Sequence, residues 1–404
     1  MEGGGTDDVN ATMRATLLLI LSTWSVSACA PQARRTSSGS DDGSDQRATS
    51  TTADAVAGSR DEYATACESG DAVGCFNLGV LHDRGDGVAQ DHALAATLYR
   101  RACDGRVMEG CNNLGVLTEH GRGVEEDLEG AAALYEQACD GGSAGGCANL
   151  AVMFENGRGV ATDRRRAVAL YERGCEAGHE QACFSLATAY DLGRGVTEDP
   201  TRAAELYERA CEDGSREGCN RLAMMVGEGR GVDRDDARAA DLFRQACQAD
   251  AVSACNNLGL MYEDGRGVDQ SPERAVELYE HVCEAGEMAG CNNLGRLVAE
   301  GRGTAQDFPR AAAVFQRACN NGSLNACNNL GALYEDGRGV EQDDFQAVSL
   351  YQQTCDEGSA RGCFNLGMAY VHGRGVERDR GRGAALVRQA CQAGLSDACD
   401  ALRQ

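Results

Sequence analysis

Cysteines are the residues with the clearest chemistry in this 404-residue sequence, because their spacing is strictly regular. Zinc sites favour C-x2-C spacing and four ligands, often with histidine, whereas the six histidines here share no repeat position. A disulfide needs two Cα atoms about 5–6 Å apart, which a seven-residue gap between neighbouring helices can supply. We therefore expect ten local disulfides in an oxidising compartment, and no metal or cofactor. The C-x7-C pairs recur every 36 residues and are Cys67 with Cys75, Cys103 with Cys111, Cys139 with Cys147, Cys175 with Cys183, Cys211 with Cys219, Cys247 with Cys255, Cys283 with Cys291, Cys319 with Cys327, Cys355 with Cys363 and Cys391 with Cys399.

The remaining cysteine, Cys29, follows a short apolar run at residues 15–26. About a dozen apolar residues are too few to span a bilayer comfortably and are typical of a signal peptide. The segment ending at Cys29, Val-Ser-Ala-Cys, resembles the bacterial lipoprotein cleavage box, which would make Cys29 the lipidated first residue of the mature chain. We expect a signal peptide at 1–28, for which Met13 is a better start than the acidic Met1 segment. An ordinary secretory signal and a membrane anchor are the alternatives.

The segment 29–59 is rich in Ser, Thr, Asp and Gly and has almost no large apolar side chain. Such a composition cannot bury a core, so we expect a disordered tether. Together, these features predict an extracytoplasmic lipoprotein that is held to its membrane by lipid only and faces the periplasm or the cell surface.

Overall composition excludes several classes of function. All 38 basic residues are arginine, so the chain lacks the lysine of Schiff-base enzymes, Ser-Lys dyads and Walker-type phosphate loops. A net charge of −25 argues against nucleic acid as a partner, because binding to phosphates requires a basic surface.

The elements that must position the cysteines repeat with the same period of 36 residues. After Cys111, Leu114 and Leu117 have helical spacing, and Gly121-Arg122-Gly123 ends that helix. Asp127 then caps a second helix that contains Tyr135 and ends near the next cysteine. The cap position holds Asp91, Asp127, Asp163, Asp199, Asp235, Ser271, Asp307, Asp343 and Asp379, and the tyrosine position holds Tyr99, Tyr135, Tyr171, Tyr207, Phe243, Tyr279, Phe315 and Tyr351.

Stacked helix pairs of fixed period predict an all-α solenoid at 60–404. The glycine turns indicate nine full pairs, with an additional helix before Cys67 and a stub after Cys399. Each disulfide would then join the second helix of one pair to the first helix of the next.

The repeats resemble a known family. The segments 256–280 and 328–351 both begin Asn-Asn-Leu-Gly and contain Leu-Tyr near their ends. With these residues they resemble the Sel-one-like repeat, a relative of the tetratricopeptide repeat. The C-x7-C pairs resemble those of its secreted, cysteine-rich bacterial subclass. This resemblance covers about 60–404 and implies a right-handed α/α superhelix that recognises proteins or peptides on its concave face. Some cysteine-rich members have been assigned penicillin binding and β-lactamase activity, so a hydrolase is the alternative.

The sequence offers no catalytic residue. Serine β-lactamases need S-x-x-K and K-T-G, which a chain without lysine cannot contain. The one G-x-S-x-G match, at 141–145, lies in a turn between helices and not after a strand. We therefore expect a binding scaffold and leave the hydrolase as the alternative function.

Two sets of recurring polar residues are candidates for binding. An asparagine precedes the repeated leucine, and in tetratricopeptide-like solenoids this helix lines the concave face, where the amides could bind a peptide backbone. The alternative is that they cap or bridge neighbouring helices. These candidate ligand-binding residues are Asn77, Asn113, Asn149, Asn257, Asn293, Asn329 and Asn365. One arginine recurs in the glycine turns, and we expect it to pair with local acids such as Asp264 or Asp336.

Overall fold

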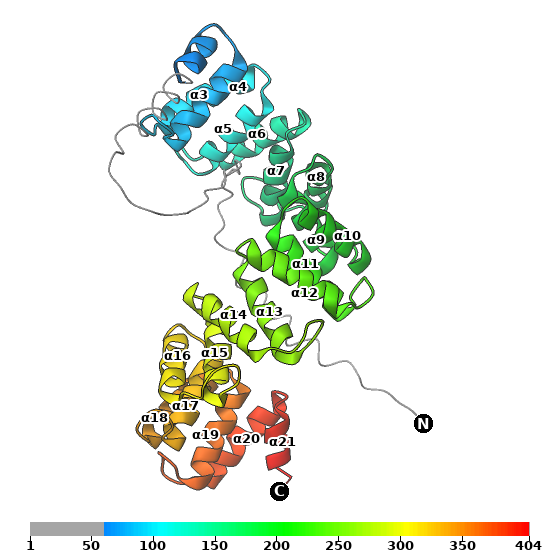
Figure 1. Ribbon diagram of the computed structural model, residues 1–404. Coiled ribbons are helices and arrows are strands. Elements are labelled where there is room, and N and C mark those ends of the chain that lie inside the picture. Colours follow the sequence, from blue (N-terminus) through cyan, green and yellow to red (C-terminus); the bar gives the residue numbers. More distant parts are fainter. Residues whose placement is uncertain (1–59, 404) are drawn as a thin grey trace, which may run out of the picture. The chain divides into compact units, whose positions relative to one another are not determined.

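The structure is a computed structural model that describes residues 60–403 (Figure 1). This part of the chain contains helices and no strands: a helix at 60–68, followed by nine helix pairs and a short final helix. The first helices of repeats 1–9 are α3 Ala72–Arg84, α5 Met108–Glu119, α7 Ala144–Asn156, α9 Glu180–Leu192, α11 Arg216–Glu228, α13 Val252–Asp264, α15 Met288–Glu300, α17 Leu324–Asp336 and α19 Ala360–His372. The second helices are α4 His92–Asp104, α6 Leu128–Asp140, α8 Arg164–Glu176, α10 Pro200–Glu212, α12 Asp236–Gln248, α14 Pro272–Glu284, α16 Phe308–Asn320, α18 Asp344–Asp356 and α20 Arg380–Gln392, and α21 is Ser396–Ala401.

The second helices begin where the cap residues predict. In each of them the aspartate or serine at the cap position accepts a hydrogen bond from a backbone N–H of the first turn, as Asp127 does from Gly130. Such a bond satisfies an N–H group that has no partner within the helix. Pro200 and Pro272 occupy the first turn directly after a cap, where proline costs no hydrogen bond.

The first helices begin earlier than the cysteine spacing suggested. Helix α5 starts at Met108, three residues before Cys111, and α7 starts after Ser143, whose hydroxyl accepts a hydrogen bond from Gly146 N–H. The chain reverses direction in only three residues because one of them has a positive φ, as Gly142 does at +95°. Each C-x7-C segment therefore contains the end of one helix, a tight turn and the first turn of the next helix.

Small residues let the two helices of a repeat approach closely. The glycine after the repeated leucine lies under the aromatic ring of the second helix: a Cβ atom on Gly115 would be 2.7 Å from the ring of Tyr135. The second glycine of each turn lies against the preceding repeat, and a Cβ on Gly267 would be 2.0 Å from the carbonyl oxygen of Asp236. Packing therefore requires a small residue at the first place, where Ala151, Ala187 and Ala223 replace the glycine, and glycine itself at the second place.

Successive helices stack in chain order, and each contacts the next. Direct contacts also join successive first helices, as in α5 with α7 and α15 with α17, whereas no equally close contact joins successive second helices in residues 60–403. Helices on the inner side of a curved stack are the closer ones, so the first helices form the inner face.

Ten disulfides connect the repeats, and every pair that the spacing predicts is confirmed. Each joins the cysteine near the end of one second helix, or of the helix at 60–68, to the cysteine in the first turn of the following helix. The Cα–Cα distances are 4.4–4.7 Å. The bonds are Cys67 to Cys75, Cys103 to Cys111, Cys139 to Cys147, Cys175 to Cys183, Cys211 to Cys219, Cys247 to Cys255, Cys283 to Cys291, Cys319 to Cys327, Cys355 to Cys363 and Cys391 to Cys399.

The second cysteine of each pair except the last, where Cys399 is half-buried, is buried for a local reason. In the first turn of its helix it faces the helix before it, so that Cys75, Cys147, Cys183, Cys219 and Cys363 are each 0–3% exposed. The expected all-α solenoid of nine helix pairs is also confirmed, including the additional helix before Cys67 and the short α21 around Cys399. Cys29, the signal peptide and the tether lie outside the described residues.

Candidate functional site

The seven candidate asparagines lie on the first helices, one per helix, and all are half-buried. Four of them donate a hydrogen bond through Nδ2 to an asparagine of the preceding repeat, 37 residues earlier. These bonds are Asn149 to Asn112 (2.8 Å), Asn257 to Asn220 (3.2 Å), Asn293 to Asn256 (3.0 Å) and Asn329 to Asn292 (2.9 Å). The structure therefore contains the bridges between neighbouring helices that were the alternative to ligand binding.

Each of these bridges uses the Nδ2 of one asparagine and the Oδ1 of the other. In the pair Asn292–Asn329, the Nδ2 of Asn292 and the Oδ1 of Asn329 make no hydrogen bond to another described residue, and the same holds for Asn256 and Asn293. These two pairs thus keep one donor and one acceptor each, whereas the Nδ2 groups of Asn112 and Asn220 also donate to Asn113 (3.3 Å) and to Ser253 (3.4 Å). Because the internal bond holds both side chains in place, the free donor and acceptor are positioned before any ligand arrives.

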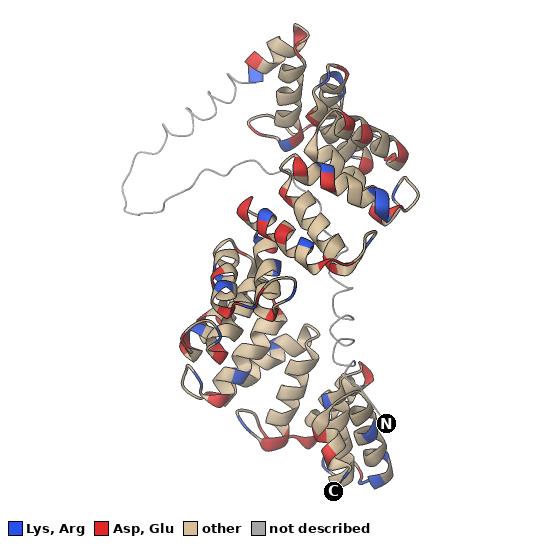
Figure 2. Ribbon diagram, turned by 90° about the vertical axis from the view of Figure 1, so that its right-hand side faces the viewer, with Lys and Arg blue, Asp and Glu red and all other residues tan. Residues whose placement is uncertain are grey.

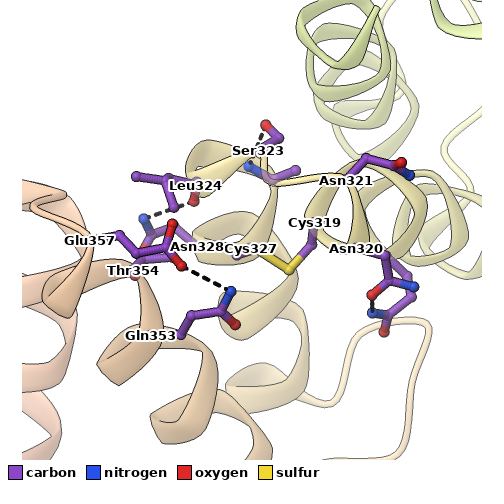
Figure 3. The surroundings of a disulfide bond; sticks show 12 residues. Cys319, Asn320, Asn321, Ser323, Leu324, Cys327, Asn328, Gln353, Thr354 and Glu357 are labelled. Carbon is purple, nitrogen blue, oxygen red and sulfur yellow. Dashed lines mark hydrogen bonds between the residues drawn. A yellow bond between two sulfur atoms is a disulfide. The ribbon is translucent and has the colours of Figure 1, made fainter. Parts of the chain in front are cut away.

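Three positions behave differently: Asn113 only accepts a hydrogen bond within its own helix, from Asn112 at 3.3 Å, and Asn77 and Asn365 have no asparagine partner. Asn365 would meet Asn328, but Asn328 is only 1% exposed and is turned into the array. There it donates to Leu324 O (3.1 Å) and Ser359 Oγ (3.2 Å) and accepts from Thr354 Oγ1 (3.2 Å), beside the disulfide Cys319–Cys327 (Figure 3). Asn77 and Asn365 make no side-chain hydrogen bond within residues 60–403.

Apolar side chains follow the asparagine positions by three residues, which places them on the same helix face. Val80, Val116, Val152 and Met368 are half-buried there and Leu260 is 39% exposed, whereas the residue three positions after Asn293 is Arg296. The inner face of the first helices, defined here as these asparagines and the residues three positions after them, therefore combines amides with partly exposed apolar side chains.

A second recurring arrangement was not predicted from the sequence. A carboxylate near the end of the first helix lies 16 residues before the tyrosine of the same repeat and usually receives its hydroxyl hydrogen bond. The bonds are Tyr99 to Asp83 (3.3 Å), Tyr135 to Glu119 (2.7 Å), Tyr171 to Glu155 (2.8 Å), Tyr279 to Glu263 (3.3 Å) and Tyr351 to Glu335 (3.0 Å). Tyr207 instead shares a hydrogen bond with Thr188 at 3.0 Å.

The same carboxylates pair with the turn arginine of the next repeat, 39 residues later. We call this ion pair between repeats the carboxylate bridge. The five bridges are Arg158–Glu119 (2.7 Å), Arg194–Glu155 (4.0 Å), Arg230–Asp191, Arg302–Glu263 (3.1 Å) and Arg374–Glu335. Arg338 pairs with Asp336 as expected (3.0 Å), but Arg266 lies 3.7 Å from Asp236 and not beside Asp264. Local pairing is also present for Arg230 with Glu228 (3.6 Å) and for Arg302 with Glu300 (3.4 Å), so this expectation is confirmed for three turn arginines and is wrong for Arg266, while the pairing of arginines with the preceding repeat was not predicted.

Glu263 shows how such a group is stabilised inside the array. It is 6% exposed, and its carboxylate meets Arg296 at 2.6 Å, Arg302 at 3.1 Å and the hydroxyl of Tyr279. Burial by itself would raise the pKa of Glu263, but the hydrogen bond and charge of Arg296, with the charge of Arg302, outweigh burial and lower it. Burial and the nearby carboxylate in turn raise the pKa of Tyr279. Glu263 is therefore ionised and Tyr279 neutral at pH 7.

One signal in the sequence could have revealed this arrangement. Tyrosine occupies its position in every repeat that has Asp or Glu 16 residues earlier, and a different residue occupies it in the three repeats that do not. Those three pairs are Gly227 with Phe243, Ala299 with Phe315 and Val371 with Val387. A buried hydroxyl needs an acceptor and a buried carboxylate needs donors, so the two residues are kept or lost together.

Other chemistry finds little support in the described residues. Residues 60–403 contain no group of three His, Cys, Asp or Glu side chains that could hold a metal ion. Ser143, of the G-x-S-x-G match, is 4% exposed and caps α7. Acidic and basic residues are interspersed along the helix ends and turns (Figure 2). None of the described helices combines the length and the apolar character that a membrane crossing requires.

Comparison with known proteins agrees with this geometry. The model of the Sel1 repeat matches nine segments, at 72–106, 109–143, 144–179, 180–215, 216–250, 252–286, 289–323, 324–359 and 360–395. No match was found among curated protein sequences.

Two solved structures are similar over most of the chain. The crystal structure of c5321, a protective antigen present in uropathogenic Escherichia coli strains that displays an SLR fold, is 29% identical with a TM-score of 0.75, over 84% of this chain and 72% of that chain. A Sel1 repeat protein from Oxalobacter formigenes is 25% identical with a TM-score of 0.59, over 76% of this chain and 89% of that chain. The ten disulfides indicate an extracytoplasmic location. With nine matched repeats in the described helices, the chain belongs to the Sel1 repeat family, whose members generally mediate protein–protein interactions.

Proposed function

We propose that the inner face of the first helices binds extended peptide segments of partner proteins. The observation that carries this proposal is that the amide pairs Asn256–Asn293 and Asn292–Asn329 each keep one donor and one acceptor free, on a face that also carries partly exposed apolar side chains such as Leu260. An extended peptide presents the complementary C=O and N–H groups together with side chains that can cover the apolar positions.

The energetics favour a ligand that touches several repeats. Each hydrogen bond contributes only about 0.5–1.5 kcal/mol net, so one amide pair cannot hold a peptide. Repeats 5–8 carry three successive pairs, Asn220–Asn257, Asn256–Asn293 and Asn292–Asn329. Because these amides are already ordered by their own bond, little side-chain entropy is lost on binding.

A peptide-binding measurement tests this function. The oxidised protein is applied to immobilised short peptides of randomised sequence, and the peptides it retains are used to titrate a variant that carries both Asn293→Ala and Asn329→Ala. We expect that variant to bind at least about tenfold more weakly, as the loss of two to three hydrogen bonds implies. The matched control carries Asn320→Ala and Asn321→Ala, which removes two exposed asparagines at the end of a second helix. Equal peptide binding by both variants would contradict the proposal that peptides bind to the inner face.

We also propose that the chain is a lipoprotein, with a signal peptide at 1–28, lipid on Cys29, a tether at 29–59 and the array at 60–404. The extracytoplasmic location that the disulfides indicate supports this arrangement. Metabolic labelling with an alkyne fatty acid, followed by mass spectrometry of the mature N-terminus, should place lipid on Cys29. Loss of the label in Cys29→Ala is expected, and a label that persists would contradict the assignment.

A further inference from the structure

The carboxylate bridges divide the junctions between repeats into two classes. Bridges cross the junctions between repeats 2 and 3, 3 and 4, 4 and 5, 6 and 7, and 8 and 9. At the junction of repeats 1 and 2 the carboxylate of Asp83 is present, but it is held within its own repeat by His92 (2.9 Å) and Tyr99. The junctions between repeats 5 and 6 and between repeats 7 and 8 have no carboxylate at this place, because Gly227 and Ala299 occupy the position.

At the junction of repeats 5 and 6 the turn arginine is present but meets a different carboxylate, because Arg266 lies 3.7 Å from Asp236, whose side chain is 25% exposed. A Cβ atom added to Gly227 would be 3.7 Å from Nη2 of Arg266 and 3.4 Å from the Cβ of Ala239, so a side chain there would begin beside the cation without a clash at its Cβ. The tyrosine that would share the carboxylate is Phe243, which is buried at 5% exposure. This junction therefore keeps the arginine but lacks the carboxylate and the tyrosine of a bridged junction.

The two junctions that lack the carboxylate, between repeats 5 and 6 and between repeats 7 and 8, keep the disulfide and the asparagine bond, so the repeats remain connected there. The disulfide ties the second helix to the next first helix, as Cys247 and Cys255 do. The asparagine bond, Asn257 to Asn220 or Asn329 to Asn292, lies between neighbouring first helices. Neutral amide bonds and the partly exposed pair of Arg266 with Asp236 resist bending of the first helices against one another less than a carboxylate bridge does, most clearly that of Glu263, which is buried and pairs with two arginines.

We propose that the junctions between repeats 5 and 6 and between repeats 7 and 8 are hinges of the array. Repeats 6 and 7, which Glu263 joins through Arg302, form a rigid unit between the hinges, and repeats 2–5 and 8–9 form two further bridged units. Since the three successive amide pairs of repeats 5–8 cross both hinges, bending changes the spacing of these pairs. The proposal rests on the bridges alone and stands whether or not the inner face binds peptide.

Distance distributions between spin labels test the hinges directly. The label sites Ala169, Asp241, Ala313 and Ala385 are exposed and occupy the same position in the second helices of repeats 3, 5, 7 and 9. Labels are introduced through a noncanonical ketone-bearing residue, which leaves all ten disulfides oxidised. Double electron–electron resonance then compares three pairs of equal sequence separation: 169/241 crosses two bridged junctions, whereas 241/313 and 313/385 each cross one bridged and one unbridged junction.

We expect broader distributions for 241/313 and 313/385 than for 169/241. Installing the missing pair with Gly227→Glu and Phe243→Tyr should narrow the 241/313 distribution to the width of 169/241 and leave 313/385 unchanged. The converse variant, Glu155→Ala with Tyr171→Phe, copies the natural pair of Ala299 and Phe315 into the control span and should broaden 169/241. Helical circular dichroism and ten intact disulfides check that each variant is folded. Equal widths for the three spans, or no response to either variant, would overturn the proposal.

Discussion

Replacing Glu263 by alanine and Tyr279 by phenylalanine, singly and together, measures how strongly the two groups depend on each other. Tyr279 is fully buried, and its hydroxyl donates to Glu263 at 3.3 Å. The Tyr279→Phe change removes one hydrogen bond to a charged acceptor that keeps two arginines, so it should cost about 1–2 kcal/mol.

The Glu263→Ala change should cost more, because it leaves groups without partners. The buried hydroxyl of Tyr279 loses its acceptor, and Arg296 and Arg302 keep only the exposed Glu300 as counter-charge, at 3.5 Å and 3.4 Å. Breaking a buried pair costs about 3–5 kcal/mol, but these arginine side chains are 32% and 40% exposed and water screens them. We therefore expect about 2–4 kcal/mol. In the double variant the unpaired hydroxyl is gone, so its cost should fall below the sum of the single costs by about 1–2 kcal/mol.

Hydrogen exchange of the backbone amides in α15 is the appropriate assay. A repeat array does not unfold as a single two-state unit, whereas native-state exchange reports the local opening free energy beside the substituted groups. Additivity within about 0.5 kcal/mol would refute the coupling. Repeat 7 supplies the converse control: Phe315→Tyr alone should destabilise, because no acceptor is present at Ala299, and Ala299→Glu in the same chain should restore stability.

Four further predictions concern pH, backbone conformation and the disulfides. The folded pKa of Glu263 is below its ordinary value, so its stabilising effect is complete at neutral pH and is lost as pH falls through the folded pKa; Glu263→Gln should flatten the acid side of a plot of unfolding midpoint against pH. Burial raises the pKa of Tyr207 to about 12, so the neutral Tyr207 contributes its full stabilisation below about pH 10, and this contribution is lost as pH rises. The tyrosinate absorbance of Tyr207, measured as the difference from a Tyr207→Phe variant, should therefore increase together with loss of helicity. Ionisation of Tyr207 near pH 10 in a fully helical protein would contradict this prediction. Gly267→Ala places a Cβ 2.0 Å from a backbone oxygen at φ +66° and should prevent normal stacking, whereas Gly286→Ala, at φ +93° with nothing within 4 Å, should cost only about 1–2 kcal/mol in thermal unfolding. Replacing Cys283 and Cys291 by alanine should cost about 2–3 kcal/mol, and non-reducing peptide mapping of the parent protein should find only the ten local pairs.

Much of the fold could be predicted because it depends on groups that are close along the chain. The cap residues determine where second helices begin, and the C-x7-C spacing brings two cysteines together across one tight turn, as in Cys139 with Cys147. Such features need only the local geometry of a helix and a turn, and the 36-residue period repeats them without interruption. The helix starts before the second cysteine were missed because a positive φ at residues such as Gly142 shortens the turn.

The candidate site was predicted less completely. The asparagine position was identified, but its hydrogen-bond partner was not. Asn149 donates to Asn112, which lies one residue before Asn113, the equivalent of Asn149 in the preceding repeat. Likewise, Arg302 meets the local acid Glu300 as expected, but it also reaches Glu263 in the preceding repeat, which was not predicted.

The sequence by itself therefore determined the repeat, the helix pairs, the disulfide partners and the family resemblance, all of which follow from local spacing. Only the tertiary structure decided which residues of neighbouring repeats meet. Those contacts depend on the rotation and shift of one helix pair against the next, which result from packing side chains such as Tyr135 over Gly115. A shift by a single residue would change every partner on the inner face, and no local pattern in the chain specifies it.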